Sequence, residues 1–267
     1  GFPKDSRSAR AKRLVREERL MIILKTDEEI AVMAKAGRIA RECLLRIGEM
    51  VRPGVKTKDL DRFAEDFIRS QGALPTFKGL YGFPATICTS KNEVVVHGVP
   101  GETVLEEGDI IAIDVGATYQ GFVGDTAATF PVGEVSPEAL KLIEVTRKAL
   151  ELGIEQAVVG NRIGDIGHAI ETYVRRHGYS VVKDYAGHGV GRSMHEGPTV
   201  PNYGRPGTGA LLRKGMVIAI EPMVNAGGSA VVTFPDMHVV TKDGSWSAHF
   251  EHTVAITENG PVCLTGV

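Results

Sequence analysis

Four carboxylates stand in apolar segments of the sequence, where an isolated negative charge is costly. Asp114 closes the run IIAID, Glu221 closes VIAIE, Asp125 follows Val-Gly, and Glu251 lies within AHFEHTVAI. A buried carboxylate takes up a proton or binds a cation, yet no lysine or arginine recurs beside all four. If the fold gathers them, divalent metal ions would relieve their repulsion. The sequence thus predicts a carboxylate-rich metal centre, of the kind that activates water for hydrolysis.

Histidines supply further candidates for this centre. His188 lies in the run Ala-Gly-His-Gly-Val-Gly, whose glycines let backbone approach a crowded site. A phosphate-binding loop is the competing interpretation, but no helix with apolar periodicity follows it. His97, in VVVHGVP, and His195, seven residues after His188, are the other candidates, whereas His252 would point to the strand face opposite Glu251. The remaining histidines are interpreted as solvated or as hydrogen-bonded in the core: His168, His177, His238 and His249.

The segments that carry two of the carboxylates are copies of each other. Residues 105–114 (LEEGDIIAID) match residues 212–221 (LRKGMVIAIE) at an offset of 107, and a second pair of segments upstream matches at an offset of 106. For any single carboxylate, a strand-end cap or a surface ion pair is the simpler interpretation. The equivalence of Asp114 and Glu221 weakens it. We therefore interpret the chain as a duplicated half.

Each half is predicted to contain two helices followed by strands. Thr26-Asp-Glu-Glu29 is a capping box and Ser136-Pro137 is an N-cap with a first-turn proline, so a helix is expected after each. The second helices lie in the matched segments 54–72 and 160–178, and both end at glycine. The β-branched runs before the carboxylates indicate strands buried on both faces. Helices layered on a curved, mostly antiparallel sheet, in two pseudo-symmetric halves, indicate an α+β fold and a single domain over residues 21–267.

Two of the carboxylates are expected to meet across one hairpin. Residues 117–121 (ATYQG) supply a turn, and residues 122–130 are typical of the returning strand. Asp114 and Asp125 would then face each other, provided that the strand alternation keeps both on one face.

Composition narrows the class of protein. The 267 residues are 43% apolar and 24% charged with a net charge of −2, which is typical of a soluble globular protein. No stretch approaches the ~18 apolar residues of a membrane span, and the start is too charged for a signal peptide. Cys43, Cys88 and Cys263 are odd in number and far apart. We therefore expect a reducing compartment, the cytoplasm, with no disulfide framework and no cysteine zinc site.

The first twenty residues are basic. They carry seven basic and three acidic side chains, a net charge of +4, whereas the remainder carries −6. Such an arm could touch RNA or the ribosome. A short arginine-rich terminus without aromatic residues is more typical of a flexible tail, or of residues foreign to the natural chain, which would then start at Met21.

In order and spacing, these residues resemble type I methionine aminopeptidases. The resemblance runs from Thr26 to Thr257 and rests on NEVVVHGVP, IAIDVGA, GDTAATF, GHGVGRSMHEGP, IAIEPM and FEHTVAI. It implies the pita-bread fold and a centre of two divalent ions, of cobalt, manganese, iron or zinc. The 33 residues from His188 to Glu221 resemble type I, since type II enzymes carry an insertion there.

The resemblance also implies which residues bind the two ions. Asp114 would chelate one ion, and His188 and Glu221 would bind the other. Asp125 and Glu251 would bridge the two.

The activity implied is removal of the N-terminal methionine from new polypeptides with a small second residue. Water made nucleophilic by the two ions would attack the first peptide bond, while the free α-amine of the substrate occupies an open coordination position. Glu221 would accept and shuttle the proton, His195 would stabilise the tetrahedral intermediate, and His97 would contact the substrate near the scissile amide.

A slot for the methionine side chain would include Phe83 and Cys88, with Leu80 and Met194 as further candidates. Members of the family often carry aromatic residues near the positions of Leu80 and Met194, and the sequence departs from that pattern. Cys88 has a second interpretation as a plain core thiol. Three further residues resemble a site at which members of the family bind a structural monovalent cation: Asn92, Val94 and Ser247.

Three alternatives stay open. An X-Pro aminopeptidase or prolidase shares the metal residues but usually adds an N-terminal domain, which 20 residues cannot supply. Creatine amidinohydrolase relatives share the fold without metal. A non-catalytic relative that binds RNA or protein has support only from the basic arm. The partners expected are the N-terminal segments of nascent polypeptides, with ribosome contact left open. We expect a monomer with no membrane association and no dedicated nucleic-acid site.

Overall fold

The structure, a computed structural model, describes residues 21–266, so the basic arm at residues 1–20 lies outside the described residues. Thr26 caps the first described helix by accepting a hydrogen bond from the backbone N–H of Glu29, whose carboxylate accepts one from the N–H of Thr26. Ser136 caps a later helix in the same way at Ala139. Both predicted helix starts are confirmed. The long helices are α2 (Asp27–Met50), α3 (Thr57–Ser70), α4 (Pro137–Glu155) and α5 (Ile163–Arg176).

The strands are short apart from one long hairpin. They are β1 (Leu74–Pro75), β2 (Ile87–Lys91), β3 (Val94–Val96), β4 (Ile110–Tyr119), β5 (Phe122–Pro131), β6 (Ser180–Val181), β7 (Gly187–Gly189), β8 (Glu196–Val200), β9 (Val217–Ile220), β10 (Met223–Asn225), β11 (Val231–Thr233), β12 (Val239–Thr241), β13 (Ser247–His249), β14 (His252–Thr257) and β15 (Gly260–Cys263). These strands pair in antiparallel fashion.

Within residues 21–266, the predicted antiparallel strands divide into four small sheets. One joins β1, β4, β2 and β5, and another runs in the order β15-β14-β9-β7-β8. A single bridge between Ala127 and Glu251 connects these two sheets. Regular pairing stops there because threonine hydroxyls bind the neighbouring carbonyls: Thr126 Oγ1 donates to Glu251 O, and Thr253 Oγ1 donates to Asp125 O.

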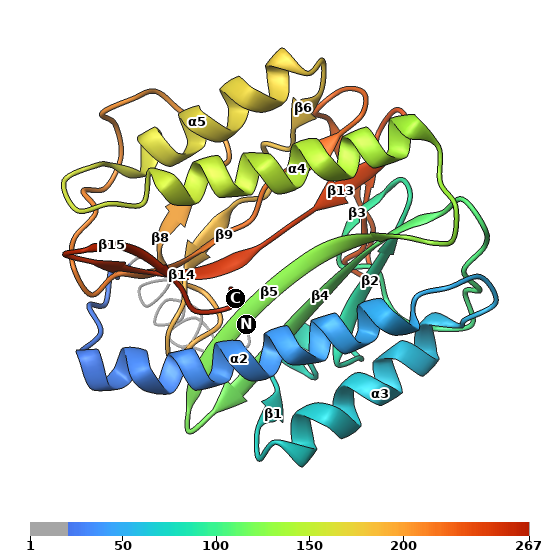
Figure 1. The fold of residues 1–267 in the computed structure, drawn as a ribbon, viewed down its shortest axis with the longest axis horizontal. Helices are drawn as coiled ribbons and strands as arrows, with labels where there is room; N and C mark the ends of the chain where they lie inside the picture. The colour runs from blue at the N-terminus through green and yellow to red at the C-terminus, as the bar shows by residue number, and fades with distance from the viewer. Residues whose placement is uncertain (1–20, 267) are drawn as a thin grey trace, which may run out of the picture.

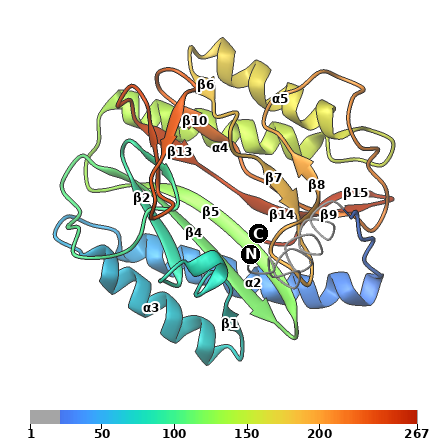
Figure 2. The same ribbon diagram turned by 180° about the vertical axis from the view of Figure 1, so that it is seen from behind.

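The two helix pairs cover one face of the strands, α2 with α3 over one half and α4 with α5 over the other (Figures 1 and 2). Helices α3 and α5 both have 14 residues and begin 106 positions apart, as the repeated segments predicted. Each pair closes its own apolar core, around Ile47 and Ile113 in the first half and around Ile166 and Ile218 in the second. A third cluster contains Met33, Val123, Val217 and Ala255 and so joins residues of both halves.

Candidate metal centre

The hairpin of β4 and β5 positions the first two carboxylates. Asp114 pairs with Ala127, and Asp125 pairs with Gly116, so the two aspartates are diagonal neighbours on one face instead of lying directly opposite. Asp114 also lies in the middle of β4, not at a strand end as predicted, because β4 continues to Tyr119. The diagonal placement still brings the two carboxyl groups into contact.

A glycine next to Asp125 lets its strand touch a helix. A Cβ on Gly124 would lie 2.5 Å from the backbone nitrogen of Gly37 and 2.6 Å from the carbonyl carbon of Ala36, both in α2. Real Cβ atoms do not approach backbone so closely, so only glycine permits this packing of β5 on α2. The position of Asp125 is thereby fixed against a long helix.

The second half supplies the other ligand candidates from three neighbouring strands. His188 lies inside the short strand β7, because its backbone pairs with Ala219 of β9. Glu221 follows β9 directly. Glu251 lies between β13 and β14 and is paired only through the bridge to Ala127, so the predicted strand is interrupted there.

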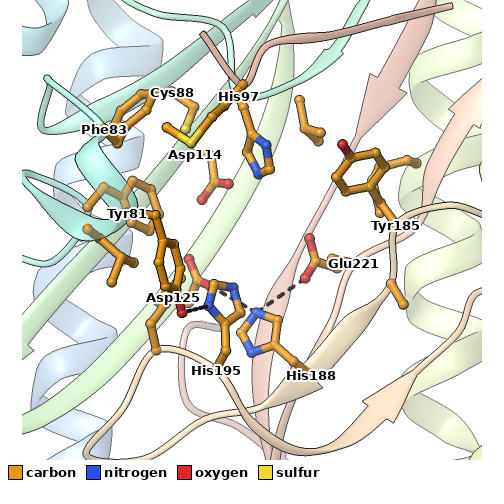
Figure 3. A pocket seen from close by; sticks show the side chains of 17 residues that line it. Tyr81, Phe83, Cys88, His97, Asp114, Asp125, Tyr185, His188, His195 and Glu221 are labelled. Carbon is orange, nitrogen blue, oxygen red and sulfur yellow. Dashed lines mark hydrogen bonds and ion pairs between the residues drawn. The ribbon is translucent and has the colours of Figure 1, made fainter. Parts of the chain in front are cut away.

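Distances show that the two halves meet at these side chains (Figure 3). The Nε2 atom of His188 lies 3.3 Å from Oε1 of Glu221 and 3.6 Å from Oδ2 of Asp125. Its Nδ1 lies 2.8 Å from the carbonyl oxygen of Gly189, to which it donates a hydrogen bond. That bond leaves the lone pair of Nε2 directed at the carboxylates, which is the usual arrangement of a metal-binding histidine.

The donor set fits divalent metal. Four carboxylate oxygens are buried without a hydrogen-bond partner: Asp114 Oδ1, Asp125 Oδ1, and both oxygens of Glu251. In residues 21–266, the ion pairs of these carboxylates and of Glu221 involve histidines and no lysine or arginine. One oxygen or nitrogen each from Asp125, His188 and Glu251 lies within 4.8 Å of the others. Buried carboxylate oxygens that lack hydrogen-bond partners and lie this close together are stabilised by a bound cation.

The electrostatics of the cluster lead to the same requirement. Burial raises the pKa of Asp114 and of Glu251 well above the usual range, and the neighbouring carboxylates raise both further. Burial alone would lower the pKa of His188, but Asp125 and Glu221 raise it to about 10. Burial acts to raise the pKa of Glu221, yet the imidazoles beside it lower that pKa to about 2. Without metal, the cluster holds protons in place of positive ions.

His249 belongs to this cluster, although the sequence analysis assigned it to the core or to solvent. Its Nε2 lies 3.3 Å from Oε2 of Glu221, and it forms a second group with Glu221 and Glu251 whose donor atoms lie within 4.8 Å of one another. A usable signal was present in the sequence. Strand alternation over two residues places His249 on the same face as Glu251.

His97 and His195 lie at the cavity but outside both ligand groups. His97 follows β3 in a left-handed conformation (φ 62°), and its ring meets Tyr185 edge-on, with centroids 5.8 Å apart. Burial lowers the pKa of His97, which favours the neutral imidazole. The ring of His195 lies 4.4 Å from that of His188, centroid to centroid.

The cavity beside the centre has a volume of about 280 Å³. The four predicted slot residues all line it: Leu80, Phe83, Cys88 and Met194. Phe83 and Cys88 lie together at one end, across the cavity from Tyr185 (Figure 3). Burial and the nearby Asp114 raise the pKa of the Cys88 thiol. Sequence reasoning did not single out seven further lining residues: Phe77, Tyr81, Val96, Tyr185, Ala186, Met223 and Met237.

Two of the three residues suggested for a monovalent cation, Asn92 and Ser247, are in direct contact. The carbonyl oxygen of Asn92 accepts a hydrogen bond of 2.9 Å from the N–H of Ser247. The amide oxygen of Asn92 accepts from the N–H of Ile110, and its Nδ2 donates to Asp109. Val94 opens β3 two residues later.

Comparison with known proteins agrees with this geometry. The sequence pattern of metallopeptidase family M24 matches residues 31–258. The chain belongs to this family. It is 56% identical over 247 residues to a methionine aminopeptidase of Clostridium acetobutylicum, covering 92% of this chain and 99% of that one. Methionine aminopeptidase 1 of Bacillus subtilis is 52% identical over 248 residues, covering 92% and 100%.

Solved structures agree with the fold of this M24 chain. A methionine aminopeptidase from Thermotoga maritima superposes with a TM-score of 0.91 at 46% identity, covering 92% of this chain and all of that one. A prolidase from Pyrococcus horikoshii reaches 0.74 at 27% identity, with 92% and 64% covered. The α+β pita-bread fold that the resemblance implied is confirmed. Within residues 21–266, none of the helices is long and apolar enough to cross a membrane.

Proposed function

We propose that this protein is a metal-dependent aminopeptidase that removes methionine from polypeptides with a small second residue. The observation that carries the proposal is a carboxylate and imidazole cluster beside a small apolar slot. Leu80, Phe83, Cys88 and Met194 line the same cavity as Asp114 and Glu221. A thioether side chain matches such a slot in size and polarity. The names of the most similar relatives support the same activity.

We infer that the centre holds two divalent ions, drawn from cobalt, manganese, iron or zinc. The two groups of ligand atoms, which share Glu251, support two positions. We assign Asp114 to one position, His188 and Glu221 to the other, and Asp125 and Glu251 to both. The 3.3 Å between His188 Nε2 and Glu221 Oε1 supports placing that pair on one ion. Ions bound there would polarise the scissile carbonyl and make water acidic enough to lose a proton near neutral pH.

The side chains around the centre have separate roles in proton transfer, charge stabilisation and substrate binding. Glu221, whose oxygens lie 3.3 Å from Nε2 of His188 and of His249, would accept the proton of the attacking water. His195 stabilises the negative charge that develops on the carbonyl oxygen. His97, buried and neutral, hydrogen-bonds the substrate near the scissile amide. The slot excludes side chains larger than methionine, since added volume forces strain on closely packed walls.

The remaining proposals concern domain organisation, location and partners. We propose that residues 21–267 form a single catalytic domain, which the apolar cluster shared by both halves supports. We place the protein in the cytoplasm as a monomer acting on nascent polypeptides, consistent with three free cysteines. Contact with the ribosome would involve the basic residues before position 21. A structural monovalent cation at Asn92, Val94 and Ser247 remains part of the proposal.

An assay of the metal-stripped protein tests this function. Each divalent ion is added back singly, and the protein is given Met-Ala-Ser and an Ala-Pro peptide. We expect methionine release from the first peptide and no cleavage of the second. Release from the Ala-Pro peptide alone would establish the X-Pro alternative. No cleavage of either peptide with any ion would leave a binding role, for RNA or protein, as the better account.

A further inference from the structure

One loop carries two of the residues that line the cavity. Residues 190–195 connect β7, which holds His188, to β8. Met194 and His195 of this loop line the cavity, whereas Glu196, the first residue of β8, does not. Neighbouring side chains of an extended chain point to opposite sides. Glu196 is therefore directed to the side of the loop that faces away from the cavity.

The carboxylate of Glu196 lies inside the 190–195 loop. Its Oε1 accepts a hydrogen bond of 3.4 Å from the N–H of Ser193, whose carbonyl oxygen accepts one of 3.1 Å from the N–H of Gly191. A Cβ on Gly191 would lie 2.5 Å from Oε1 of Glu196 and 2.6 Å from Cε of Lys25. The loop thus folds closely around the carboxylate and the lysine beside it.

Lys25 reaches this carboxylate from the chain segment before α2. Its Nζ lies 2.5 Å from Oε2 of Glu196, and the two side chains are 3% and 4% exposed. Two backbone hydrogen bonds hold the segment in place. The N–H of Lys25 donates to the carbonyl oxygen of Gly215 at 2.8 Å, and the carbonyl oxygen of Met21 accepts from the N–H of Gly197 at 3.1 Å. The lysine is therefore presented to the loop from a fixed backbone.

This buried ion pair is better suited to fixing a geometry than to adding stability. The cost of taking two charges out of water offsets most of their attraction, so apolar side chains of similar size would fill the same space at little loss. Apolar contacts have no preferred direction, whereas hydrogen bonds between charged groups do. Because Glu196 bonds both Lys25 and the loop backbone at Ser193, the pair holds the loop in one position.

We propose that Lys25 and Glu196 are positioning residues for His195, and that they keep its imidazole in place beside the reacting carbonyl. The inference rests on the proposed function, in which His195 stabilises the charge that develops on the carbonyl oxygen. A displacement of about 1 Å in such a group lowers the rate by up to about 10²-fold. Lys25 and Glu196 do not line the cavity, so their effect on the reaction passes through the loop.

The test compares the loss of the ion pair in two backgrounds. Lys25→Met/Glu196→Leu replaces the pair by apolar side chains of similar size. In Co²⁺-loaded protein acting on Met-Ala-Ser, we expect the double change to lower kcat about 10- to 100-fold. In a His195→Ala background it should lower kcat by less than about threefold, because the group through which it acts is gone. The same factor in both backgrounds would overturn the proposal.

Ile166→Ala is the control for lost stability. Ile166 is fully buried in the core of the second half and does not line the cavity, so its truncation destabilises the fold without touching the loop. Its kcat should stay within a factor of two of wild type at a temperature where every variant is folded. A loss of kcat equal to that of Lys25→Met/Glu196→Leu would assign the effect to stability and overturn the proposal.

Amide hydrogen exchange of the same samples without peptide separates this inference from the proposed function. We expect residues 190–196 to exchange at least about tenfold faster in Lys25→Met/Glu196→Leu than in wild type or Ile166→Ala, because the hydrogen bond at Ser193 is lost. Unchanged exchange would overturn the inference whether or not the wild type releases methionine. Faster exchange in a protein that releases no methionine would refute the function and leave the loop contact standing.

Discussion

The hydroxyl of Tyr81 lies 3.2 Å from Nδ1 of His195, and the two rings stack with centroids 5.8 Å apart. Tyr81 adopts a left-handed conformation (φ 51°) inside the short turn η1 (Leu80–Gly82), which is uncommon for a bulky residue. The turn thus brings an aromatic side chain from the first half onto a histidine of the second. The contact fixes the plane of the His195 ring beside the metal centre.

His195→Ala and His97→Ala are expected to lower kcat by about 10²- to 10³-fold, because each would remove a polar group that we propose acts on the reacting amide. Neither belongs to a ligand group, so metal content should stay within a factor of two. Peptide kinetics and elemental analysis of the same samples measure both quantities. Tyr81→Phe, which keeps the stacked ring and loses the hydroxyl, should reduce kcat far less. Loss of metal in proportion to activity would show that these histidines are ligands.

Gly124→Ala should destabilise the protein by about 3 kcal/mol, because the new methyl group would overlap backbone atoms of α2. The matched change Gly101→Ala meets nothing within 4 Å and should leave the free energy of unfolding nearly unchanged. Urea denaturation of metal-free samples compares the two. Equal stability of both variants would mean that β5 does not need to touch α2.

Lys25→Met should cost about 3–5 kcal/mol, since it leaves the Glu196 carboxylate buried without its partner. The two side chains are 3% and 4% exposed, and Lys25 Nζ lies 2.5 Å from Glu196 Oε2. The double variant Lys25→Met/Glu196→Leu should recover most of that loss, because it removes the unpaired charge as well. The midpoints of urea unfolding of wild type, Lys25→Met and the double variant compare their stabilities. A double variant no more stable than Lys25→Met would contradict the expectation.

His252 should make the protein less stable in acid. Burial, with the charge of Arg41, lowers its pKa from 6.5 to about 4. Between those values the unfolded chain takes up a proton that the folded chain refuses, so stability present above pH 6.5 is lost as the pH falls toward 4. The stability advantage of wild type over His252→Gln should shrink by about 1.4 kcal/mol per unit between pH 6 and 5. Parallel unfolding curves over that range would refute the shift.

Much of the fold followed from local signals. The caps at Thr26 and Ser136 defined helix starts, and the matched segments predicted helices of equal length in both halves. Sheet boundaries did not follow. The seam between the halves depends on the hydroxyls of Thr126 and Thr253, which replace backbone pairing at long sequence separation. No local pattern distinguishes such a threonine from any other strand residue.

The candidate site was foreseeable where a residue type was chemically out of place. A carboxylate in an apolar strand is costly wherever it sits, so Asp114 and Glu221 could be singled out from the sequence alone. Tyr81 could not, because a tyrosine is unremarkable in a turn, and for His249 the sequence offered only its strand alternation with Glu251. Their positions beside His195 and Glu221 arise from contacts between distant segments.

The sequence by itself determined the helices, the duplication and the need for a cation, since all three follow from residue type and spacing within short segments. Tertiary structure decided which donors share that cation. Strand register set the diagonal placement of Asp114 and Asp125, and the packing of distant strands within the second half placed His188 and His249 beside opposite oxygens of Glu221. Those distances depend on long-range packing, which the local pattern of side chains does not encode.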